Sequence, residues 1–270
     1  MSDVVLLKLG GSLITDKARP ETPRREVLAR IAGEIVRGAA GCPFRFVVGH
    51  GSGSFGHVAA RRFDLTAGVR SAGQLAGISI TQERAAALHR LLIEALAEAG
   101  ALPFSIAPSS CVVSAGGGPV EFADEPLLLA LEQGLLPVVY GDVVMDRDRG
   151  ASICSTERLF ALVIRRLLDQ GWAVRRVLWL GETDGLYDAE GRTVPNLAAE
   201  DLAEAAKAIG SPAGTDVTGG MLHRVETALA LARWGIPSLL ANGLTPGLLE
   251  KALRGEEVAG TVVARAASLP

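Results

Sequence analysis

Short apolar runs that end in glycine predict the strands of a buried sheet. Residues 4–9 form such a run, interrupted only by Lys8 and followed by Gly10 and Gly11. Runs that do not alternate with polar residues are typical of parallel strands, because both faces of such strands are covered. Strands are therefore predicted at residues 4–9, 44–48, 136–140, 174–180 and 238–240, with a further strand after Gly100.

Apolar residues one helical turn apart predict helices between these strands. After Pro23, the residues Val27, Ile31 and Ile35 recur at this spacing until Gly41 ends the pattern. Further helices are predicted at residues 74–99, 124–134 and 156–170, from about 198, up to about 234 and near 248. The alternation predicts one α/β domain over residues 1–270, with a largely parallel sheet covered by helices on both faces.

Two segments rich in Asp, Arg and Gly predict hairpins inserted after strands. They are "VVMDRDRGASI" at residues 143–153 and "GLYDAEGRTV" at residues 185–194. Each places polar turn residues between short runs that favour β structure. We expect neither hairpin to belong to the core. The helix at 156–170 should join the strands on either side of it in a βαβ unit.

Composition and charge exclude several classes of partner. The 270 residues carry a net charge of -3 and are 49% hydrophobic but only 4% aromatic. This balance gives no positive surface for nucleic acid or anionic lipid, and no apolar stretch approaches the roughly 20 residues that span a membrane. The three cysteines are far apart in sequence, which argues against a zinc site or a disulfide framework and favours the cytoplasm. They are Cys42, Cys111 and Cys154.

The first of three glycine-rich turns, "KLGGSLITDK", follows the first strand. Its glycines allow backbone amides to approach an anion, and lysines at both ends supply positive charge. It is not a P-loop, because no lysine follows the second glycine directly. The alternative is an ordinary turn with a solvated lysine.

The second turn, "VVGHGSGSFGH" at residues 47–57, follows the second strand. Its crowded glycines suggest a run of backbone donors for an anion. His57 follows a glycine at a possible helix start, where its ring would meet that anion; alternatively it is a surface or capping histidine. His50, at a strand end, and His89, inside an amphipathic helix, are expected to be structural.

The third turn, "GTDVTGGMLHRVETAL" at residues 214–229, offers a helix N-terminus to a nucleotide phosphate, with Arg224 one turn into the helix. The same pattern is common in ordinary loop-to-helix junctions. Asp142, Glu182 and Asp184 close strands, where they would orient lysines, hold magnesium through water, contact a ribose or simply form turns.

The order of these motifs resembles the amino acid kinase family and, within it, the isopentenyl phosphate kinases. The motifs are "KLGGSLITDK", "GHGSGSFGH", "YGDVV", "TDGLYD" and "DVTGGM". The resemblance implies an αβα sandwich in three layers and a homodimer. It also implies ATP over a C-terminal half of about residues 171–270 and the acceptor over an N-terminal half of about residues 1–170. The implied reaction is the Mg²⁺- and ATP-dependent phosphorylation of isopentenyl phosphate to isopentenyl diphosphate.

The resemblance also implies roles for individual residues, but no direct protein ligand for a metal. Catalytic roles fall to Lys8, Lys17 and His57. ATP-binding roles fall to Lys8, Gly10, Gly11, Ser12, Gly53, Glu182, Gly220 and Arg224. Acceptor-binding roles fall to Ser52, Gly53, His57 and Thr156.

The chain departs from the family pattern at three places. Arg224 stands where a lysine is usual, and Glu182 where an aspartate is common. Near Thr156 and Glu157, in "ICSTERL", the family usually has a glycine and acidic pair, so this departure puts the acceptor contact expected there in question.

Two other functions fit the same motifs. One is a related kinase for another phosphate or phosphonate acceptor, such as fosfomycin, and the other is a nucleotide-binding protein without turnover. A phosphate monoester acceptor, with a second pKa near about 6 like that of phosphorylated side chains, is largely a dianion at neutral pH and needs no general base. This suits a sequence that offers lysines, backbone amides and a histidine but no evident base dyad. A dinucleotide oxidoreductase is disfavoured because no G-x-G-x-x-G follows the first strand.

Overall fold

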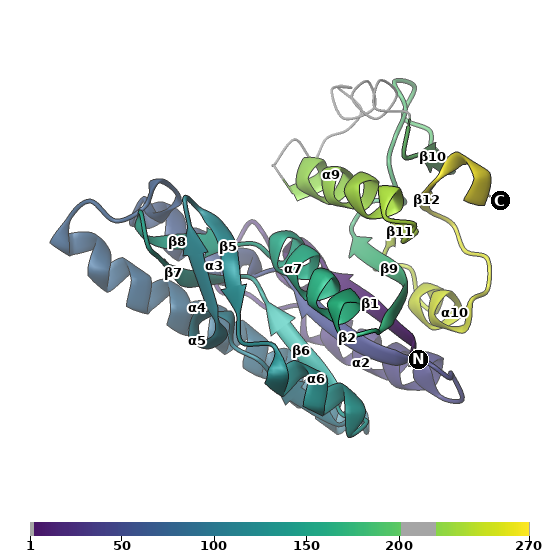
Figure 1. Ribbon diagram of the computed structural model, residues 1–270, viewed down its shortest axis with the longest axis horizontal. Coiled ribbons are helices and arrows are strands. Elements are labelled where there is room, and N and C mark those ends of the chain that lie inside the picture. Colours follow the sequence, from purple (N-terminus) through teal and green to yellow (C-terminus); the bar gives the residue numbers. More distant parts are fainter. Residues whose placement is uncertain (1–2, 201–219, 270) are drawn as a thin grey trace.

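A mostly parallel sheet runs through the molecule, and the first predicted strand lies near its centre. The structure, a computed structural model, describes residues 3–200 and 220–269. The described strands form an eight-stranded sheet in the order β10-β12-β11-β9-β1-β2-β6-β3 (Figure 1). Strand β1 (Asp3–Leu9) runs parallel to both of its neighbours, β2 (Arg45–His50) and β9 (Ala173–Gly181).

The other strands extend this sheet on both sides. They are β3 (Pro103–Ser105), β6 (Leu136–Tyr140), β10 (Asn196–Ala198), β11 (Ser238–Asn242) and β12 (Thr261–Ala264). Among the described pairings, β11 with β12 is the antiparallel one and the rest are parallel. The carboxyl ends of β1, β2, β6 and β9 therefore meet at one edge of the sheet, where ligands bind in folds of this kind.

Successive side chains of β1 enter two separate hydrophobic layers. Val5 and Leu7 pack on one face of the sheet, while Val4 and Leu6 pack on the other. The first layer is covered by α2 (Arg25–Ala39), α4 (Ala72–Glu98) and α10 (Leu248–Arg254). The second layer is covered by α6 (Glu125–Glu132), α7 (Thr156–Asp169) and α9 (Gly220–Arg233). Helices on both faces confirm the predicted αβα sandwich.

A second, four-stranded sheet corrects one expectation. Its order is β5-β4-β7-β8, with β4 (Val112–Ala115), β5 (Gly118–Phe122), β7 (Asp142–Asp146) and β8 (Gly150–Cys154). The hairpin predicted at residues 143–153 is confirmed as β7 and β8, but the expectation that it lies outside the core is wrong. Val144 and Cys154 are buried in the second layer because β4 extends the hairpin into a sheet.

The segment at residues 185–194 is also closer to the core than expected. A single antiparallel bridge joins Tyr187 to Thr193, so this segment is a turn rather than a full hairpin. Leu186, inside it, is 3% exposed and belongs to the second layer, which contradicts the expectation for this segment as well. The backbone amide of Leu186 donates to the hydroxyl of Thr261, which holds the turn against β12.

Most predicted elements are confirmed, with ends that differ by no more than two residues. The helix predicted from about 198 and the glycine-rich turn at 214–220 fall almost entirely on residues outside the described part of the chain. The two strands of the predicted βαβ unit, β6 and β9, run in the same direction in one sheet. They are not neighbours, because β2 and β1 lie between them. The strand predicted after Gly100 is confirmed as β3, whereas the short strands β4, β5, β10 and β12 were not predicted.

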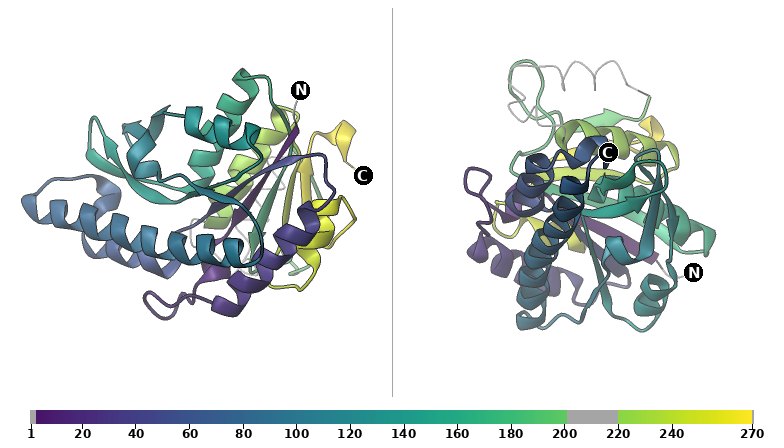
Figure 2. Two further views of the ribbon diagram at one scale, coloured as in Figure 1. Left: turned by 90° about the horizontal axis from the view of Figure 1, so that it is seen from below. Right: turned by 90° about the vertical axis from the view of Figure 1, so that its left-hand side faces the viewer.

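Helix α4 projects beyond the main sheet together with the β7–β8 hairpin, as the left panel of Figure 2 shows. No helix in the described ranges is long and apolar enough to cross a membrane.

Two glycine turns cross at the carboxyl ends of β1 and β2. A Cβ on Gly11 would lie 2.6 Å from both the Cα and the backbone nitrogen of Gly53, and one on Gly51 would lie 2.9 Å from the nitrogen of Gly11. Gly53 has φ of +52°, a conformation that L side chains rarely adopt. The contacts are backbone against backbone, so neither turn can accept a side chain without moving the other.

Replacing Gly11 by alanine should therefore destabilise the fold by about 2 kcal/mol, the usual range for overpacking. The matched control is Gly73→Ala in the first turn of α4, where the added Cβ meets only the hydroxyl of Ser71 at 4.0 Å. That variant should gain up to about 1 kcal/mol from reduced backbone entropy. Urea unfolding followed by tryptophan fluorescence measures both, and equal stability of the two variants would contradict the crossing.

Candidate active site

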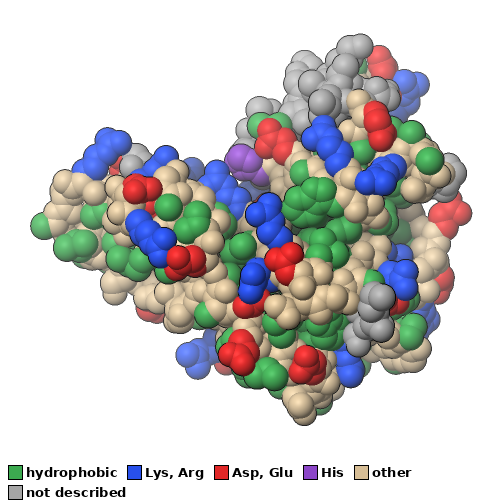
Figure 3. All heavy atoms as spheres, in the orientation of Figure 1, with side chains coloured by type: hydrophobic (Ala, Val, Ile, Leu, Met, Phe, Trp, Pro, Cys, Tyr) green, Lys and Arg blue, Asp and Glu red, His purple; other side chains and the backbone are tan. Residues whose placement is uncertain are grey.

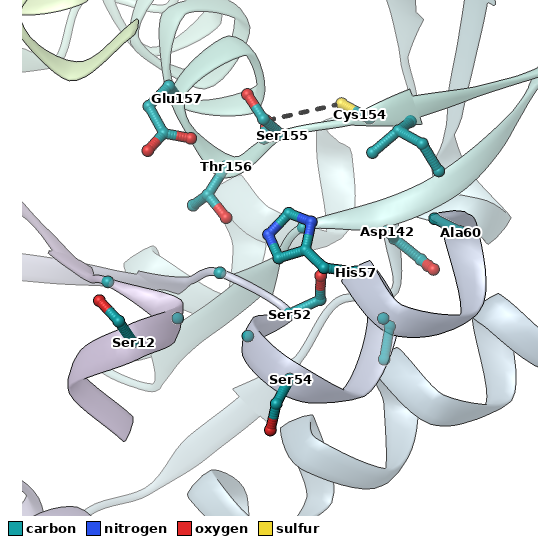
Figure 4. Close-up of a pocket in the computed structure, with 18 of the residues that line it drawn as sticks. Ser12, Ser52, Ser54, His57, Ala60, Asp142, Cys154, Ser155, Thr156 and Glu157 are labelled. Carbon is teal, nitrogen blue, oxygen red and sulfur yellow. Dashed lines mark hydrogen bonds between the residues drawn. The ribbon is translucent and has the colours of Figure 1, made fainter. Parts of the chain in front are cut away.

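A cavity of about 500 Å³ opens where the two glycine turns cross. One wall is made by the first glycine turn (residues 10–12) and the second glycine turn (residues 51–53). The others come from α3 (Gly53–Arg62), from α4, from the ends of β7 and β8 with the N-terminus of α7, and from α9. Figure 4 shows these elements converging on one space, which we call the central cavity.

The hydroxyl of Thr15 fastens the two turns together. It donates to the carbonyl oxygen of Gly11 at 2.7 Å and accepts the backbone amide of Ser54 at 3.0 Å. The parallel register sets Lys8 opposite Gly49, so the two turns emerge side by side from neighbouring strands. Thr15, four residues after Gly11, thus holds together the two turns whose close approach the glycines permit.

Lys8 and Glu157 form a buried ion pair on the cavity wall. Nζ of Lys8, on β1, lies 2.6 Å from Oε1 of Glu157, in the first turn of α7. Burial favours the neutral form of Glu157, but the charge of Lys8 and its hydrogen bond outweigh this and lower the pKa of the carboxyl to about 2. Burial lowers the pKa of Lys8, with Glu157 acting in the opposite direction.

Arg224 brings a second cation to the same wall from α9. It is 6% exposed and lines the cavity. Its guanidinium lies so close to the first glycine turn and the end of β9 that a Cβ on Gly181 would be 2.6 Å from Nη1. The positive charge of Arg224 also lowers the pKa of Lys8. This cluster of cations is suited to an anion of high charge.

His57 projects from α3 towards the N-terminus of α7, with its ring in the open part of the cavity (Figure 4). Helix α3 begins at Gly53, four residues before the expected start, so His57 lies inside the helix. Desolvation lowers the pKa of the imidazole, and the positive charges of Arg61 and Lys8 lower it further. The ring is therefore neutral near pH 7 and able to donate or accept a hydrogen bond.

The central cavity brings together most of the residues singled out from the sequence. Its lining includes Lys8, Gly10, Gly11, Ser12, Lys17, Ser52, Gly53, His57, Thr156 and Arg224. Figure 3 shows Lys and Arg side chains along the hollow between the projecting part of the molecule and the rest.

Two of the residues predicted to bind ATP are described by the structure but do not line the central cavity. Glu182, at the start of the turn after β9, is not part of the cavity lining and pairs with Arg24 at 2.8 Å. Gly220 begins α9, one turn before Arg224. Their roles in ATP binding stay predictions. Asp216 and Thr218 fall outside the described residues.

Sequence reasoning did not identify the role of Glu157, and it left several roles open for Asp142. Glu157 lies 149 positions from Lys8 in the chain, so no local pattern links them. Asp142 lines the cavity, but its carboxylate accepts the backbone amides of Ser109 and Val143 rather than orienting a lysine. Burial raises the pKa of Asp142. An acidic residue in the first turn of a helix that follows a strand was the one signal available for Glu157.

The carboxylates of the cavity do not form a dedicated metal site. Among residues 3–200 and 220–269, no three His, Cys, Asp or Glu side chains lie close enough together to hold an ion. The two lining carboxylates, Asp142 and Glu157, are engaged by backbone amides and by Lys8. The wall is thus suited to phosphate groups, and a divalent cation would arrive mainly on their oxygens, as Mg²⁺ usually does.

Comparison with known proteins identifies similar chains along almost the whole length. A model of the amino acid kinase family matches residues 3–242. The isopentenyl phosphate kinase of Methanothermobacter thermautotrophicus is 35% identical over 269 residues, covering 96% of this chain and 98% of that one. The isopentenyl phosphate kinase of Haloferax volcanii is 33% identical, with 96% and 98% covered. A solved isopentenyl phosphate kinase structure gives a TM-score of 0.79 at 30% identity, covering 96% and 99%.

Replacing Glu157 by glutamine should destabilise the fold by about 3 kcal/mol or more, because the buried ammonium of Lys8 loses its countercharge. The pKa of Lys8 would fall further in this variant. Between that lowered value and the usual 10.5, the unfolded chain binds more protons than the folded one, so stability rises with pH. The deficit should therefore be smaller at about pH 9 than at about pH 7.

Urea denaturation at the two pH values measures this effect. Lys8→Met combined with Glu157→Gln is the matched control, since it leaves no charge buried and should recover much of the lost stability. Wild-type stability of the single variant, or a deficit that does not change with pH, would show that the pair is not a buried charge pair in solution.

Proposed function

The chain belongs to the amino acid kinase family, and we propose that within it this protein is an isopentenyl phosphate kinase. It would transfer the γ-phosphate of ATP to isopentenyl phosphate and release isopentenyl diphosphate. The proposal is supported by isopentenyl phosphate kinases that match the chain from end to end. The observation that carries it is a single cavity that joins Lys8, Lys17 and His57 around two crossing glycine turns.

We assign the donor phosphates to the first glycine turn. The amides of Gly10, Gly11 and Ser12 would approach the β- and γ-phosphates, with Lys8 as a fixed cation beneath them. Arg224 adds charge from α9, the one described helix of the C-terminal half that lines the cavity. Glu182 and Gly220 would contact the nucleotide farther from the reacting phosphate. The rest of the nucleotide would lie over the C-terminal half, about residues 171–270, and the acceptor would lie over the N-terminal half, about residues 1–170.

We assign the acceptor phosphate to the space between His57 and the N-terminus of α7. Ser52, Gly53 and Thr156 line the cavity; Ser52 and Gly53 would lie at the junction between the two phosphates, and Thr156 on the far side of the acceptor. The alkenyl tail would lie against the apolar part of the wall. That part is made by Val58, Ala60, Ala85 and Ile153.

The reaction requires positioning and charge neutralisation rather than a base. In phosphoryl transfer the transition state is loose, and negative charge spreads over the equatorial oxygens of the moving group. Lys17 would stabilise that charge, while Lys8 and the backbone amides hold the leaving diphosphate. The acceptor phosphate is largely a dianion near neutral pH, so it attacks without losing a proton first. Mg²⁺, bound to the ATP phosphates, would neutralise part of their charge.

Three further statements belong to the same proposal. The protein would be a homodimer, as the family resemblance implies. It would reside in the cytoplasm, which suits its three free cysteines, Cys42, Cys111 and Cys154. Its substrates would be small molecules, and it would bind neither nucleic acid nor a membrane.

The decisive experiment incubates the purified protein with ATP, Mg²⁺ and isopentenyl phosphate and follows the product by phosphorus NMR. We expect the acceptor's phosphate signal to be replaced by two coupled diphosphate signals, with one ADP for each turnover. A panel of the phosphonate fosfomycin and several other phosphate monoesters besides isopentenyl phosphate is run in parallel. A faster reaction with another acceptor would show that this compound, and not isopentenyl phosphate, is the substrate. ATP binding without ADP formation on any acceptor would indicate a nucleotide-binding protein.

Replacing His57 by alanine should raise the KM for isopentenyl phosphate by about 10-fold or more, because the acceptor loses a hydrogen bond to a charged group. The KM for ATP serves as the internal control and should change by less than about 2-fold. Steady-state kinetics with each substrate varied in turn measures both values. Equal small effects on the two would remove His57 from the acceptor site.

Replacing Lys17 by alanine should lower kcat by about 100-fold or more, because the charge that develops in the transition state loses a cation. The control is Lys251→Ala on α10, which removes an exposed lysine outside the cavity. That variant should retain the wild-type kcat. Wild-type turnover by the Lys17 variant would refute the assigned role.

A further inference from the structure

Two histidines expected to be ordinary structural residues form a buried stack directly beneath the second glycine turn. His50 ends β2, His89 lies in α4 and Tyr140 ends β6. Their exposed fractions are 0%, 5% and 2%. The ring centroids of His50 and His89 lie 5.3 Å apart, and those of His89 and Tyr140 lie 4.3 Å apart. The proposal for phosphoryl transfer gives these rings no role.

Hydrogen bonds join the stack into a chain that ends at the second glycine turn. Nδ1 of His50 lies 3.1 Å from the carbonyl oxygen of Gly51, and Nε2 of His50 lies 3.0 Å from Nδ1 of His89. Nε2 of His89 lies 2.7 Å from the hydroxyl of Ser105, at the end of β3.

The carbonyl of Gly51 determines the direction of every hydrogen bond in this chain. A carbonyl oxygen only accepts, so Nδ1 of His50 must carry the proton and donate. A neutral His50 then accepts at Nε2, which requires the Nδ1–H of His89 to donate. His89 in turn accepts the hydroxyl proton of Ser105. Burial lowers the pKa of His50 to about 4 and that of His89 to about 2, so both imidazoles are neutral near pH 7 and each carries a single proton.

The backbone of His50 is anchored on two further sides. Its carbonyl oxygen accepts the hydroxyl of Thr156 at 2.7 Å and the backbone amide of Gly141 at 2.9 Å. The amide of Gly51 donates to the carbonyl of Leu9 at 3.0 Å. The start of the second glycine turn is therefore tied to β1, to the end of β6 and to the first turn of α7. The orientation of the next peptide is left to the side chain of His50.

That next peptide joins Gly51 to Ser52, and its orientation matters for an anion. A trans peptide points its C=O and N–H in opposite directions. Since His50 draws the carbonyl of Gly51 towards the buried stack, the amide of Ser52 points the other way. Ser52 lines the central cavity. The imidazole chain thus turns an N–H rather than a C=O towards the site.

We propose that the Ser105–His89–His50 chain orients the Gly51–Ser52 peptide so that its N–H meets the transferring phosphate, which makes His50 and His89 positioning residues for phosphoryl transfer. The catalytic part of this inference rests on the proposed function. A peptide flipped by 180° would point the partial negative charge of a carbonyl at a phosphate. The neutral stack prevents this flip by holding the carbonyl in the interior, where no water competes for it.

Two replacements of His89 separate the hydrogen bond from the packing. His89→Asn places an amide N–H where Nδ1 was and keeps the donor to His50, whereas His89→Leu fills a similar volume without a donor. We expect kcat of the leucine variant to fall by about 10-fold or more, with both KM values within about 3-fold of wild type. The asparagine variant should recover most of kcat although both variants lose thermal stability.

Leu96→Ala, two turns further along α4 and also buried, is the matched control for lost stability. It should melt at a lower temperature and keep the wild-type kcat below its melting point. Equal kcat of the leucine and asparagine variants, or wild-type kcat of the leucine variant, would overturn the positioning role.

A measurement independent of turnover keeps this inference separate from the proposed function. Nitrogen-15 NMR of the full-length wild-type protein distinguishes imidazoles protonated at Nδ1 from those protonated at Nε2. We expect both His50 and His89 to carry the proton at Nδ1. An Nε2–H form of either ring would overturn the hydrogen-bond chain even in an active kinase, while the expected tautomers in a protein that phosphorylates no acceptor would refute the proposed function alone.

Discussion

The contact between Gly11 and Gly53 is the constraint on which the rest of the site depends. The two backbones are in contact there and leave no room for a Cβ, so the turns after β1 and β2 pack directly against each other where they cross. Two neighbouring parallel strands then present their amides to one cavity. Phosphoryl transfer between two phosphates needs this proximity, because the donor and acceptor must lie in line within a few ångströms.

Charge is arranged around this crossing so that anions are favoured and no base is required. Lys8 carries a buried positive charge that Glu157 stabilises from α7, and Arg224 adds another from α9. Such fixed charges act strongly in a site with little water, and they need no reorganisation during the reaction. The same pair links β1 to α7, so the cation beneath the glycine turn and the helix beside the acceptor are held in one geometry.

The fold could be predicted from the sequence because its strands and helices follow from patterns of apolar residues that are close together in the chain. The continuous apolar run at residues 4–9 and the spacing of Val27, Ile31 and Ile35 are visible in neighbouring residues of the chain. Four short strands, β4, β5, β10 and β12, were not predicted, because three to five residues carry too little hydrophobic pattern to identify a strand. The hairpin at residues 143–153 was expected to lie outside the core, because its partner strand β4 lies about 30 positions earlier in the chain and no local pattern links the two.

The two glycine turns, the lysines that flank the first and the histidine that follows the second were identified from the residues alone. These are residue types whose chemistry is local, because glycine permits close approach and lysine carries its charge in any context. The partner that each group meets depends on the folded chain. Glu157 reaches Lys8 across 149 positions, and His50 meets His89 across 39. Burial then sets their protonation, because desolvation and a countercharge arise only after distant segments pack together.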